Sequence, residues 1–514
     1  MVNKVTTATV IGLNAYKVDV EIDVINSLPG ISIVGLPDIA INEARDRIKS
    51  ASRNSNLTFP SRRVIVNLAP ADLKKEGTNF DLPIAVGIQV EEGVIPQDAV
   101  KDYGFIGELS LDGSLRAVSG VLPLVMGLKD FGIKNVIVPI SNAKEAALVQ
   151  GINVYGASML SEVVAHFGES PIQATVVDIN KYLSKGISDD FIYDFKDVKG
   201  QHKAKKALEI AAAGGHNMLM VGSPGSGKTL MAKCFPSILP PLELSEALEL
   251  TKIYSICGLL SEEEPLMIKR PFRAVHHTAS PNGIIGGGAN PKPGEITLAH
   301  RGVLFLDEMV EFPRSVLEVL RQPLEDSEIV ISRAKYSVKY PAKFILLGAM
   351  NPCPCGYLGD REKACTCSDF QIQRYRARLS GPLLDRIDLQ VDVPRLSAEE
   401  LLSCNSVEES SSQIRERVIK ARQIQLKRYE NDGILTNSEL TPKLVKKYCR
   451  IDKDTSNLFQ TAIVKYQLSG RRYDRILKLA RTIADLDGAE NIGQIHLMQA
   501  LQYRVFDQNA LANS

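Results

Sequence analysis

The 514-residue sequence contains no tryptophan and no long apolar run. No stretch approaches the 18 or more apolar residues that a membrane span requires, and the amino-terminal residues MVNKVTTATVIG lack the long apolar core of a signal peptide. We therefore expect a cytosolic protein that has no membrane partner. The formal net charge is only +1, so any binding of a polyanion must depend on local basic patches.

Cysteine is also scarce, but four of the eight cysteines fall within the fifteen residues CPCGYLGDREKACTC. A reducing compartment argues against disulfides, so clustered cysteines are better interpreted as metal ligands. Two C-x-C pairs can place four thiolates around one tetrahedral ion, and Zn²⁺ in a structural role is the expected occupant. The alternative is a set of four free thiols. The candidate ligands are Cys353, Cys355, Cys365 and Cys367.

A phosphate-binding loop is the most specific motif in the chain. It reads GSPGSGKT, follows the apolar MLMV and runs into TLMAKCF, which predicts a strand, a turn and a helix. Glycines let the backbone N–H groups turn toward phosphates, Lys228 adds a positive charge, and the Thr229 hydroxyl can bind Mg²⁺. The loop comprises Gly222, Ser223, Pro224, Gly225, Ser226, Gly227, Lys228 and Thr229.

An acidic pair follows a second apolar run, 78 residues after Thr229. The run Val303 to Leu306 predicts a buried strand that carries Asp307 to the Mg²⁺ ion, and Glu308 can then polarise an attacking water. The loop and the acidic pair together predict binding and hydrolysis of ATP.

The pattern of apolar residues indicates an α/β protein with several domains. Strict alternation from Val18 to Val24 predicts a half-buried strand, and two more strands are expected at Arg63 to Asn67 and Asn135 to Pro139. One helix should bury Ile41, Ala44, Ile48 and Ala51. We expect an amino-terminal domain at 1–167, a linker at 168–190, a nucleotide-binding core at 191–395 with the cysteine insertion at 353–367, and a helical domain at 396–514.

Further motifs resemble the AAA+ ATPases of the magnesium-chelatase-like group, and within it the YifB/ComM family, over essentially the whole chain. They are PGEITLAHRGVLFLDE, GAMNP, SGPLLDRID and SGRRYDRILKLA. The resemblance implies an AAA+ P-loop core with a helical lid. It also implies that Asn351 is the first sensor, Arg386 an arginine finger and Arg471 the second sensor. A finger that reaches a neighbouring subunit implies a ring of identical subunits, expected to be a hexamer.

Two candidate DNA-binding loops follow from the same resemblance. The segment EIVISRAKYSVKYP predicts a hairpin of Glu328 to Ser332 and Tyr336 to Tyr340, with Arg333 and Lys335 at its tip. In this group such a hairpin faces the pore of the ring, where the tip could grip the phosphates of a strand; a solvated basic turn is the alternative. The glycine-rich IIGGGANPKPG would be a second pore loop, carrying Lys292.

Additional basic residues follow the cysteine cluster. Arg374, Arg376 and Arg378 could contact DNA or could simply form a solvated helix face. The adjacent His276 and His277 should point to different sides, so we do not expect them to share a metal ion.

The amino-terminal part resembles the proteolytic domain of Lon proteases, in NLAPADLKKEGTNFDLPIA and in GELSLDGSLRAVSGVLPLVMGLKDFGIKNVIVP. Those enzymes use a serine activated by a lysine. The matching positions hold Asn79 and Leu122, and neither side chain can perform that chemistry. We expect a catalytically inactive domain that organises the ring or binds a partner, which the sequence leaves unidentified.

The resemblance to the YifB/ComM family implies an ATP-driven motor for branch migration or unwinding of recombination intermediates during the uptake of foreign DNA. DNA, single-stranded or branched, is then the expected partner. Two alternatives remain open: a chelatase-like motor that inserts Mg²⁺ into a porphyrin, and a protein remodeller that recruits clients through its amino-terminal domain.

Overall fold

The computed structural model describes residues 3–185, 191–288, 291–332, 337–397, 408–466 and 468–503. The chain forms two compact units, one made of Met1–Lys185 and Glu243–Ile268, the other of Gly186–Leu242 and Lys269–Ser514. Among the described residues, no helix has the length and apolar character needed to cross a membrane.

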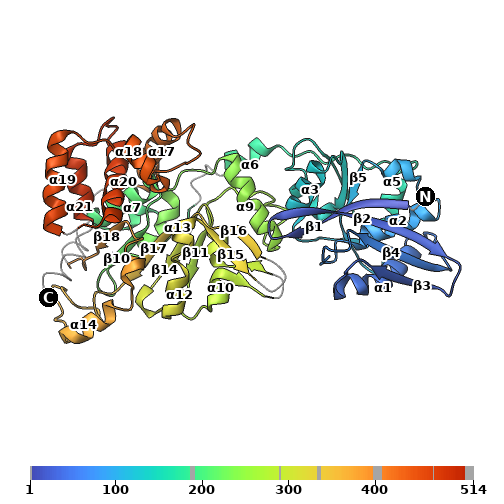
Figure 1. Ribbon diagram of the computed structural model, residues 1–514, viewed down its shortest axis with the longest axis horizontal. Helices are drawn as coiled ribbons and strands as arrows, with labels where there is room; N and C mark the ends of the chain where they lie inside the picture. Colours follow the sequence, from blue (N-terminus) through green and yellow to red (C-terminus); the bar gives the residue numbers. More distant parts are fainter. Residues whose placement is uncertain are drawn as a thin grey trace. The chain divides into compact units, whose positions relative to one another are not determined.

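The first unit is built on a seven-stranded mixed sheet with the strand order β3-β4-β2-β1-β5-β8-β9 (Figure 1). Strands β1 and β2 form an antiparallel hairpin, and β5, β8 and β9 continue the sheet in parallel. The strands are β1 (Asn3–Ile11), β2 (Asn14–Ile25), β3 (Gly30–Val34), β4 (Arg63–Ala69), β5 (Tyr103–Phe105), β8 (Asn135–Pro139) and β9 (Asn153–Ala157). Helices α1 (Ile39–Asn54), α2 (Asp81–Glu91) and α3 (Val121–Asp130) belong to the same unit.

The sequence periodicity of this unit predicts its elements well. Within β2, Val18, Val20 and Ile22 are buried in the core, as their alternation with acidic residues indicates. In α1, the four predicted core residues are all fully buried: Ile41, Ala44, Ile48 and Ala51. The strands expected at Arg63 and Asn135 are β4 and β8, so these predictions are confirmed.

Two segments of the chain depart from the expected division into domains. Residues 168–185, expected in a linker, belong to the first unit and include α6 (Ile179–Lys185). Residues Glu243–Ile268 lie inside the range 191–395 assigned to the nucleotide-binding core, yet they pack with the first unit. Their helix, α9 (Leu244–Ile256), lies against α3. The reason is tertiary: α9 has an apolar surface that α3 covers, and nothing in its local sequence specifies which unit supplies that cover.

A buried carboxylate anchors α9 to the first unit. Glu145 accepts hydrogen bonds from the Ser255 hydroxyl at 2.5 Å, the Leu122 N–H at 2.9 Å and the Asn142 amide at 3.3 Å. Burial raises the pKa of Glu145, while these donors oppose that shift. The Gly120 N–H also donates to the Ser255 carbonyl at 2.9 Å, so the end of α9 is held by both side-chain and backbone bonds.

The second unit contains a five-stranded sheet with the order β11-β14-β17-β10-β18, in which every neighbouring pair is parallel. Because parallel strands end at the same edge, the segments after β10, β14 and β17 converge there. The strands are β10 (Met218–Val221), β11 (Phe272–Val275), β14 (Val303–Leu306), β17 (Ile345–Met350) and β18 (Leu389–Asp392). The associated helices include α7 (His202–Gly214), α8 (Lys228–Cys234), α12 (Arg314–Val319), α13 (Pro323–Asp326), α14 (Asp369–Arg376) and α15 (Gly381–Leu384).

The carboxyl-terminal part of this unit is helical, as its sequence pattern predicts. Its core is continuous with that of the sheet, since Leu347 and Leu389 of the strands belong to the same buried cluster as Val418 and Ile483 of the helices. The helices are α17 (Ser411–Arg428), α18 (Pro442–Tyr448), α19 (Lys453–Tyr466), α20 (Gly470–Leu486) and α21 (Gln494–Gln502).

Two small hairpins project from the second unit. Strands β15 (Glu328–Ser332) and β16 (Ser337–Pro341) pair antiparallel, as the sequence predicts, whereas Arg333 and Lys335 lie outside the described residues. The shorter hairpin pairs β12 (Gly286–Gly287) with β13 (Lys292–Pro293), and the Lys292 side chain is exposed.

Candidate active site

The phosphate-binding loop connects β10 to α8, in the strand–turn–helix context that its sequence predicts. The Lys228 side chain is buried and turns back onto the loop, where its ammonium group donates to the Gly222 and Ser223 carbonyls at 2.7 and 2.9 Å. Burial lowers the pKa of Lys228. The Lys228 ammonium group thus lies at the centre of the loop. A phosphate bound there would replace the two carbonyls as its hydrogen-bond acceptor.

Three glycines of the loop are required by its geometry. A Cβ atom at Gly222 would lie 2.1 Å from the Val393 carbonyl oxygen, so no larger residue fits. Gly225 and Gly227 have φ angles of +79° and +90°, which side chains disfavour. The backbone can therefore make the tight turn of a phosphate-binding loop, in which the Gly222 and Ser226 N–H groups donate to the Met350 and Ser223 carbonyls.

The two predicted Mg²⁺ ligands are brought together across 78 residues of chain. The Thr229 hydroxyl, in the first turn of α8, donates to Asp307 Oδ2 at 2.8 Å, directly after β14. Thr229 is exposed and Asp307 half-buried, so both oxygens remain open to solvent. A hydroxyl and a carboxylate at this spacing fit the oxygen ligands that Mg²⁺ prefers, with water and phosphate oxygens completing the set.

Glu308 follows in the left-handed backbone region, with a φ of 49°. Its N–H donates to Asp307 Oδ1 at 3.0 Å, and its side chain is largely exposed. His277 Nδ1 lies 3.9 Å from Glu308 Oε2. The sequence alone does not reveal this neighbour of Glu308. The proximity of His277 and Glu308 follows from strand pairing. Val275 of β11 lies beside Leu306 of β14, so the residues after both strands share one edge of the sheet.

The prediction that His276 and His277 point to different sides is wrong, because the centroids of their rings lie only 4.1 Å apart. Among the described residues, the only cluster of metal-type side chains contains the four cysteines, and neither His276 nor His277 belongs to it. His276 instead hydrogen-bonds the Thr278 hydroxyl at 2.9 Å.

Asn351 lies at the same edge of the sheet. It follows Met350, the last residue of β17, whose carbonyl accepts the Gly222 N–H at 3.2 Å. The structure thus places the candidate first sensor beside the phosphate-binding loop.

Arg386 and Arg471 are placed elsewhere. Arg386 precedes β18, and its carbonyl accepts the side-chain amide of Asn217, the residue before β10, at 3.1 Å. The loop follows β10, and a four-residue strand spans roughly 13 Å. Arg386 is therefore at the edge opposite the loop.

Both arginines contact the same carboxylate. Arg386 is buried and pairs with Glu325 of α13, and Arg471 Nη2 lies 4.0 Å from the other oxygen of Glu325. Burial, together with the neighbouring charges of Arg321 and Arg475, lowers the pKa of Arg386. The side chain of Arg471 is 74 % exposed, so the two candidate phosphate-contacting arginines differ sharply in accessibility.

The four clustered cysteines meet as their spacing predicts. Their sulfur atoms all lie within 4.8 Å of one another, with Cys353 Sγ at 3.4 Å from Cys355 Sγ and 3.6 Å from Cys365 Sγ. The thiols are not joined in disulfides. Ligands 2.3 Å from a tetrahedral Zn²⁺ ion would be roughly 3.8 Å apart. The donor set therefore fits one zinc ion with four cysteine ligands.

The cysteine cluster also touches the phosphate-binding loop. Gly356, between the cysteine pairs, is so close to Pro224 that a Cβ atom there would meet the proline ring at 2.7 Å. The N–H of Glu362 and the Ser223 hydroxyl hold the pKa of Asp360 below its usual value. Residues from the insertion thus pack directly on two positions of the loop.

In the first unit, the two positions expected to match a protease dyad make structural contacts. The Asn79 amide donates to the Ala8 carbonyl at 3.1 Å, and Leu122 is fully buried. Lys75 is also buried, but its ammonium group is held by the Gly35 and Pro70 carbonyls. This arrangement offers no activated nucleophile at Asn79.

Comparison with known proteins identifies the family. Three models of the magnesium chelatase subunit ChlI match residues 20–142, 194–401 and, for its carboxyl-terminal part, 408–504. The competence protein ComM of Haemophilus influenzae is 43 % identical over 96 % of this chain and 95 % of its own length. The chain belongs to the YifB/ComM family.

Other members of the YifB/ComM family and its chelatase relatives are also similar. YifB of Salmonella typhimurium is 40 % identical over 98 % of this chain and 97 % of its own length. The magnesium-chelatase 38 kDa subunit of Rhodobacter capsulatus is 24 % identical over 61 % of this chain and 88 % of its own length. The family is therefore magnesium-chelatase-like and AAA+, which implies ATP as ligand and Mg²⁺ as its counter-ion.

Proposed function

We propose that this YifB/ComM-family protein is an ATP-hydrolysing DNA motor that works as a ring of copies, expected to be a hexamer, in branch migration or unwinding of recombination intermediates. The observation that carries the ATPase part is the Thr229 to Asp307 hydrogen bond beside Lys228 and Glu308. These residues follow two different strands, β10 and β14, and they meet at one edge of the sheet.

Each residue has a proposed part in hydrolysis. The loop N–H groups and Lys228 would hold the phosphates, and Thr229 and Asp307 would hold Mg²⁺, which supplies charge neutralisation when bound. Glu308 would orient a water and accept its proton, and Asn351 would help to position that water. His277 Nδ1, 3.9 Å from Glu308 Oε2, is a neighbour of this carboxylate but lies beyond hydrogen-bond length.

The placement of Arg386 and Arg471 supports a shared site between copies. Both meet at Glu325, at the edge opposite their own phosphate-binding loop. An arginine that stabilises phosphoryl transfer must touch the nucleotide, so these two would act on the nucleotide of a neighbouring copy. We accordingly propose the ring as the active form.

DNA is proposed as the substrate on two grounds. The relative from Haemophilus influenzae is named a competence protein, and the resemblance to its family implies action on DNA. Lys292 is exposed on the β12–β13 hairpin, and the tip residues Arg333 and Lys335 of the longer hairpin would add to it. The first unit is proposed to organise the ring or to bind a partner, without peptidase activity, in a cytosolic protein.

Zinc is proposed as a structural ion of the cysteine cluster. Purified protein should contain about one zinc per chain, and the Cys353→Ser and Cys365→Ser variants should contain much less. Elemental analysis of the protein measures this, with Cys257→Ser as a control outside the cluster. A wild-type protein that has no metal and four titratable thiols in 353–367 would contradict the proposal.

Turnover in the presence of defined DNA tests the proposed substrate. We expect ATP hydrolysis to rise several-fold with single-stranded, duplex or four-way-junction DNA, and junctions to be resolved only while ATP is hydrolysed. Phosphate release and gel electrophoresis provide the two measurements, with Lys228→Ala as the control that lacks hydrolysis. Turnover indifferent to every DNA would favour a protein remodeller or a chelatase-like motor instead.

A further inference from the structure

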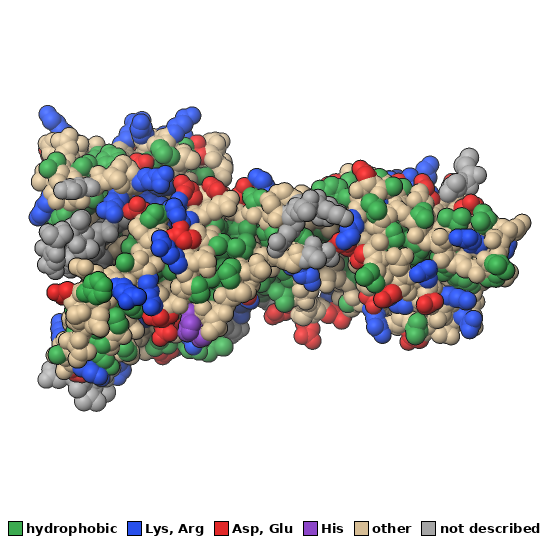
Figure 2. Space-filling view, turned by 60° about the horizontal axis from the view of Figure 1, so that its bottom comes forward, with side chains coloured by type: hydrophobic (Ala, Val, Ile, Leu, Met, Phe, Trp, Pro, Cys, Tyr) green, Lys and Arg blue, Asp and Glu red, His purple; other side chains and the backbone are tan. Residues whose placement is uncertain are grey.

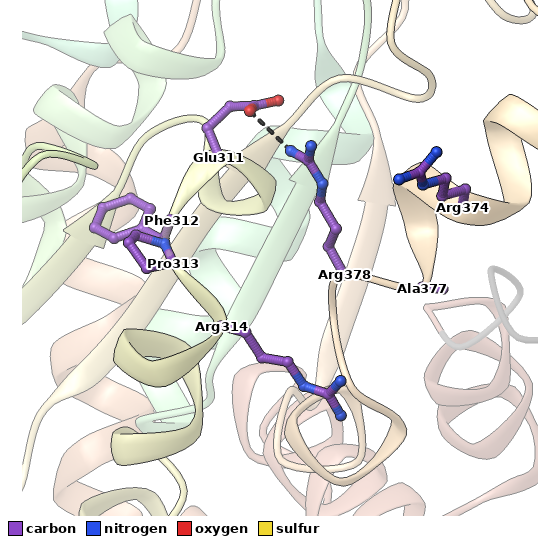
Figure 3. A pocket seen from close by; sticks show the side chains of 7 residues that line it. All are labelled: Glu311, Phe312, Pro313, Arg314, Arg374, Ala377 and Arg378. Atoms are coloured by element: carbon purple, nitrogen blue, oxygen red, sulfur yellow. Dashed lines mark hydrogen bonds and ion pairs between the residues drawn. The ribbon is translucent and has the colours of Figure 1, made fainter.

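A pocket of about 490 Å³ lies beside the candidate active site, between the start of α12 and the end of α14 (Figure 3). Three arginines line it: Arg314 at the start of α12, Arg374 within α14 and Arg378 just after α14. Its volume is in the range of sites that hold a small ligand or part of a larger one.

The charges that line this arginine pocket are largely uncompensated. Arg378 donates to Glu311 at 2.9 Å, the single dashed contact in Figure 3. The side chains of Arg314 and Arg374 are exposed, and neither has a hydrogen bond or ion pair with any residue that the structure describes. Glu311 is the only acid among the residues that line the pocket, and it pairs with Arg378 alone. Glu318 of α12, which is not part of the lining, attracts Arg314 electrostatically.

A concentration of unpaired guanidinium groups requires an explanation in a chain of nearly zero net charge. On the face shown in Figure 2, basic and acidic side chains are interspersed, which agrees with a formal net charge of +1. A group of three arginines around one pocket therefore differs from the mixed charges seen on that face. Guanidinium groups bind phosphate oxygens through paired N–H donors, so the pocket has the chemistry of a phosphate site.

The position of the pocket distinguishes between sources of phosphate. It is lined by residues that follow β14 and β17, at the carboxyl edge of the sheet, whereas Arg386 precedes β18 at the opposite edge. A nucleotide held by a neighbouring copy is assigned to the Arg386 edge in the proposed ring. The chain's own phosphate-binding loop lies at the same edge as the pocket, but none of its residues lines the pocket, so the arginines can take a phosphate other than that of the nucleotide.

We propose that the arginine pocket binds a phosphodiester group of a DNA strand. This inference rests on the proposed action on DNA and adds a contact site distinct from the two hairpins. Phe312 and Pro313 form an apolar wall on the side away from the guanidinium groups, so the pocket can accommodate a sugar together with its phosphate.

The site is connected to the catalytic turn. Glu311 follows Glu308 in one short turn, and the Glu311 N–H donates to the Glu308 carbonyl at 2.7 Å. A phosphate bound to Arg378 competes with Glu311 for the same guanidinium group. DNA bound in the pocket therefore changes the contacts of the turn that carries Glu308.

Binding of a labelled oligo(dT) strand to the full-length protein, followed by fluorescence anisotropy over a range of salt concentrations, tests the site. The double variant Arg314→Ala/Arg374→Ala should bind roughly tenfold more weakly or worse at low salt. Its slope of log K against log salt should be smaller by roughly 1.4, because two phosphate contacts to a single strand are lost.

Two further variants complete the design. Arg450→Ala removes an exposed arginine that has no hydrogen bond or ion pair among the described residues, and it should bind like the wild type. Arg314→Lys/Arg374→Lys keeps the charge and should keep most of the salt slope while losing part of the affinity. This pair separates a phosphate contact from a general effect of charge or folding.

The outcomes distinguish this inference from the proposed function. If the wild type binds DNA and the double alanine variant binds equally well with the same slope, the pocket is not a DNA site. If the wild type binds no DNA at any salt concentration, the proposed substrate itself is wrong and the inference fails with it. If the double alanine variant loses ATP turnover on its own but regains it when mixed with Lys228→Ala subunits, the pocket contacts the nucleotide of a neighbouring copy instead.

Discussion

Replacing Glu308 by glutamine should reduce ATP turnover about a hundredfold or more while ATP still binds. The amide has almost the same shape but cannot accept a proton from water. The groups proposed to hold the nucleotide are untouched, because Lys228 is held within the loop and Thr229 remains next to Asp307. Phosphate release measures turnover, and titration with a fluorescent ATP analogue measures binding.

The neighbouring carboxylate provides the matched control for Glu308→Gln. Asp307→Asn alters the candidate Mg²⁺ ligand that accepts the Thr229 hydrogen bond, so it should weaken binding of Mg²⁺ and ATP together. Of these two variants, only Glu308→Gln is expected to lose turnover while it retains binding. Normal turnover by Glu308→Gln would remove Glu308 from the mechanism.

Arg386→Ala should reduce ATP turnover about a thousandfold or more, because the Arg386 guanidinium is proposed to contact the nucleotide of a neighbouring copy. In the described chain this group is buried against Glu325, so a purely structural role has to be tested at the same time. Mixing Arg386→Ala with Lys228→Ala subunits should restore part of the activity, since each partner supplies what the other lacks at a shared site. Steady-state phosphate release over a series of mixing ratios gives the result.

Glu325→Gln separates the two roles of Arg386. It removes the carboxylate that holds Arg386 but leaves the arginine itself, so a catalytic arginine should retain substantial turnover in this variant. A structural ion pair would instead make both single variants lose activity and thermal stability alike, with no recovery on mixing. The second pattern would exclude Arg386 as a finger.

The parts of the site that the sequence predicts are those fixed by short-range rules. The loop from Gly222 to Thr229 is determined by its own glycines, and Asp307 and Glu308 follow directly from the end of an apolar strand. The cysteine cluster is likewise local, because only nine residues separate the two C-x-C pairs. In each case the residues that form the feature also specify its geometry.

The missed features depend on contacts between distant segments. Arg386 and Glu325 are 61 residues apart, and their pairing follows from the packing of α13 near the start of β18. His277 reaches Glu308 only because β11 pairs with β14. The placement of α9 on α3 is of the same kind, since the burial of Glu145 beside Ser255 is visible only after both segments are folded. No periodicity within one segment encodes such a partner.

The packing of α9 with the first unit has a practical consequence for dividing this protein into fragments. The polypeptide leaves the second unit after Leu242, completes the first unit with Glu243–Ile268, and then returns. A cut in the linker at 168–190 therefore cannot yield two intact halves. The amino-terminal fragment would lack α9 and leave Glu145 without its Ser255 donor, and the other fragment would carry an apolar helix stripped of its cover. Because the two units are interleaved along the chain, both need the continuous polypeptide to be complete.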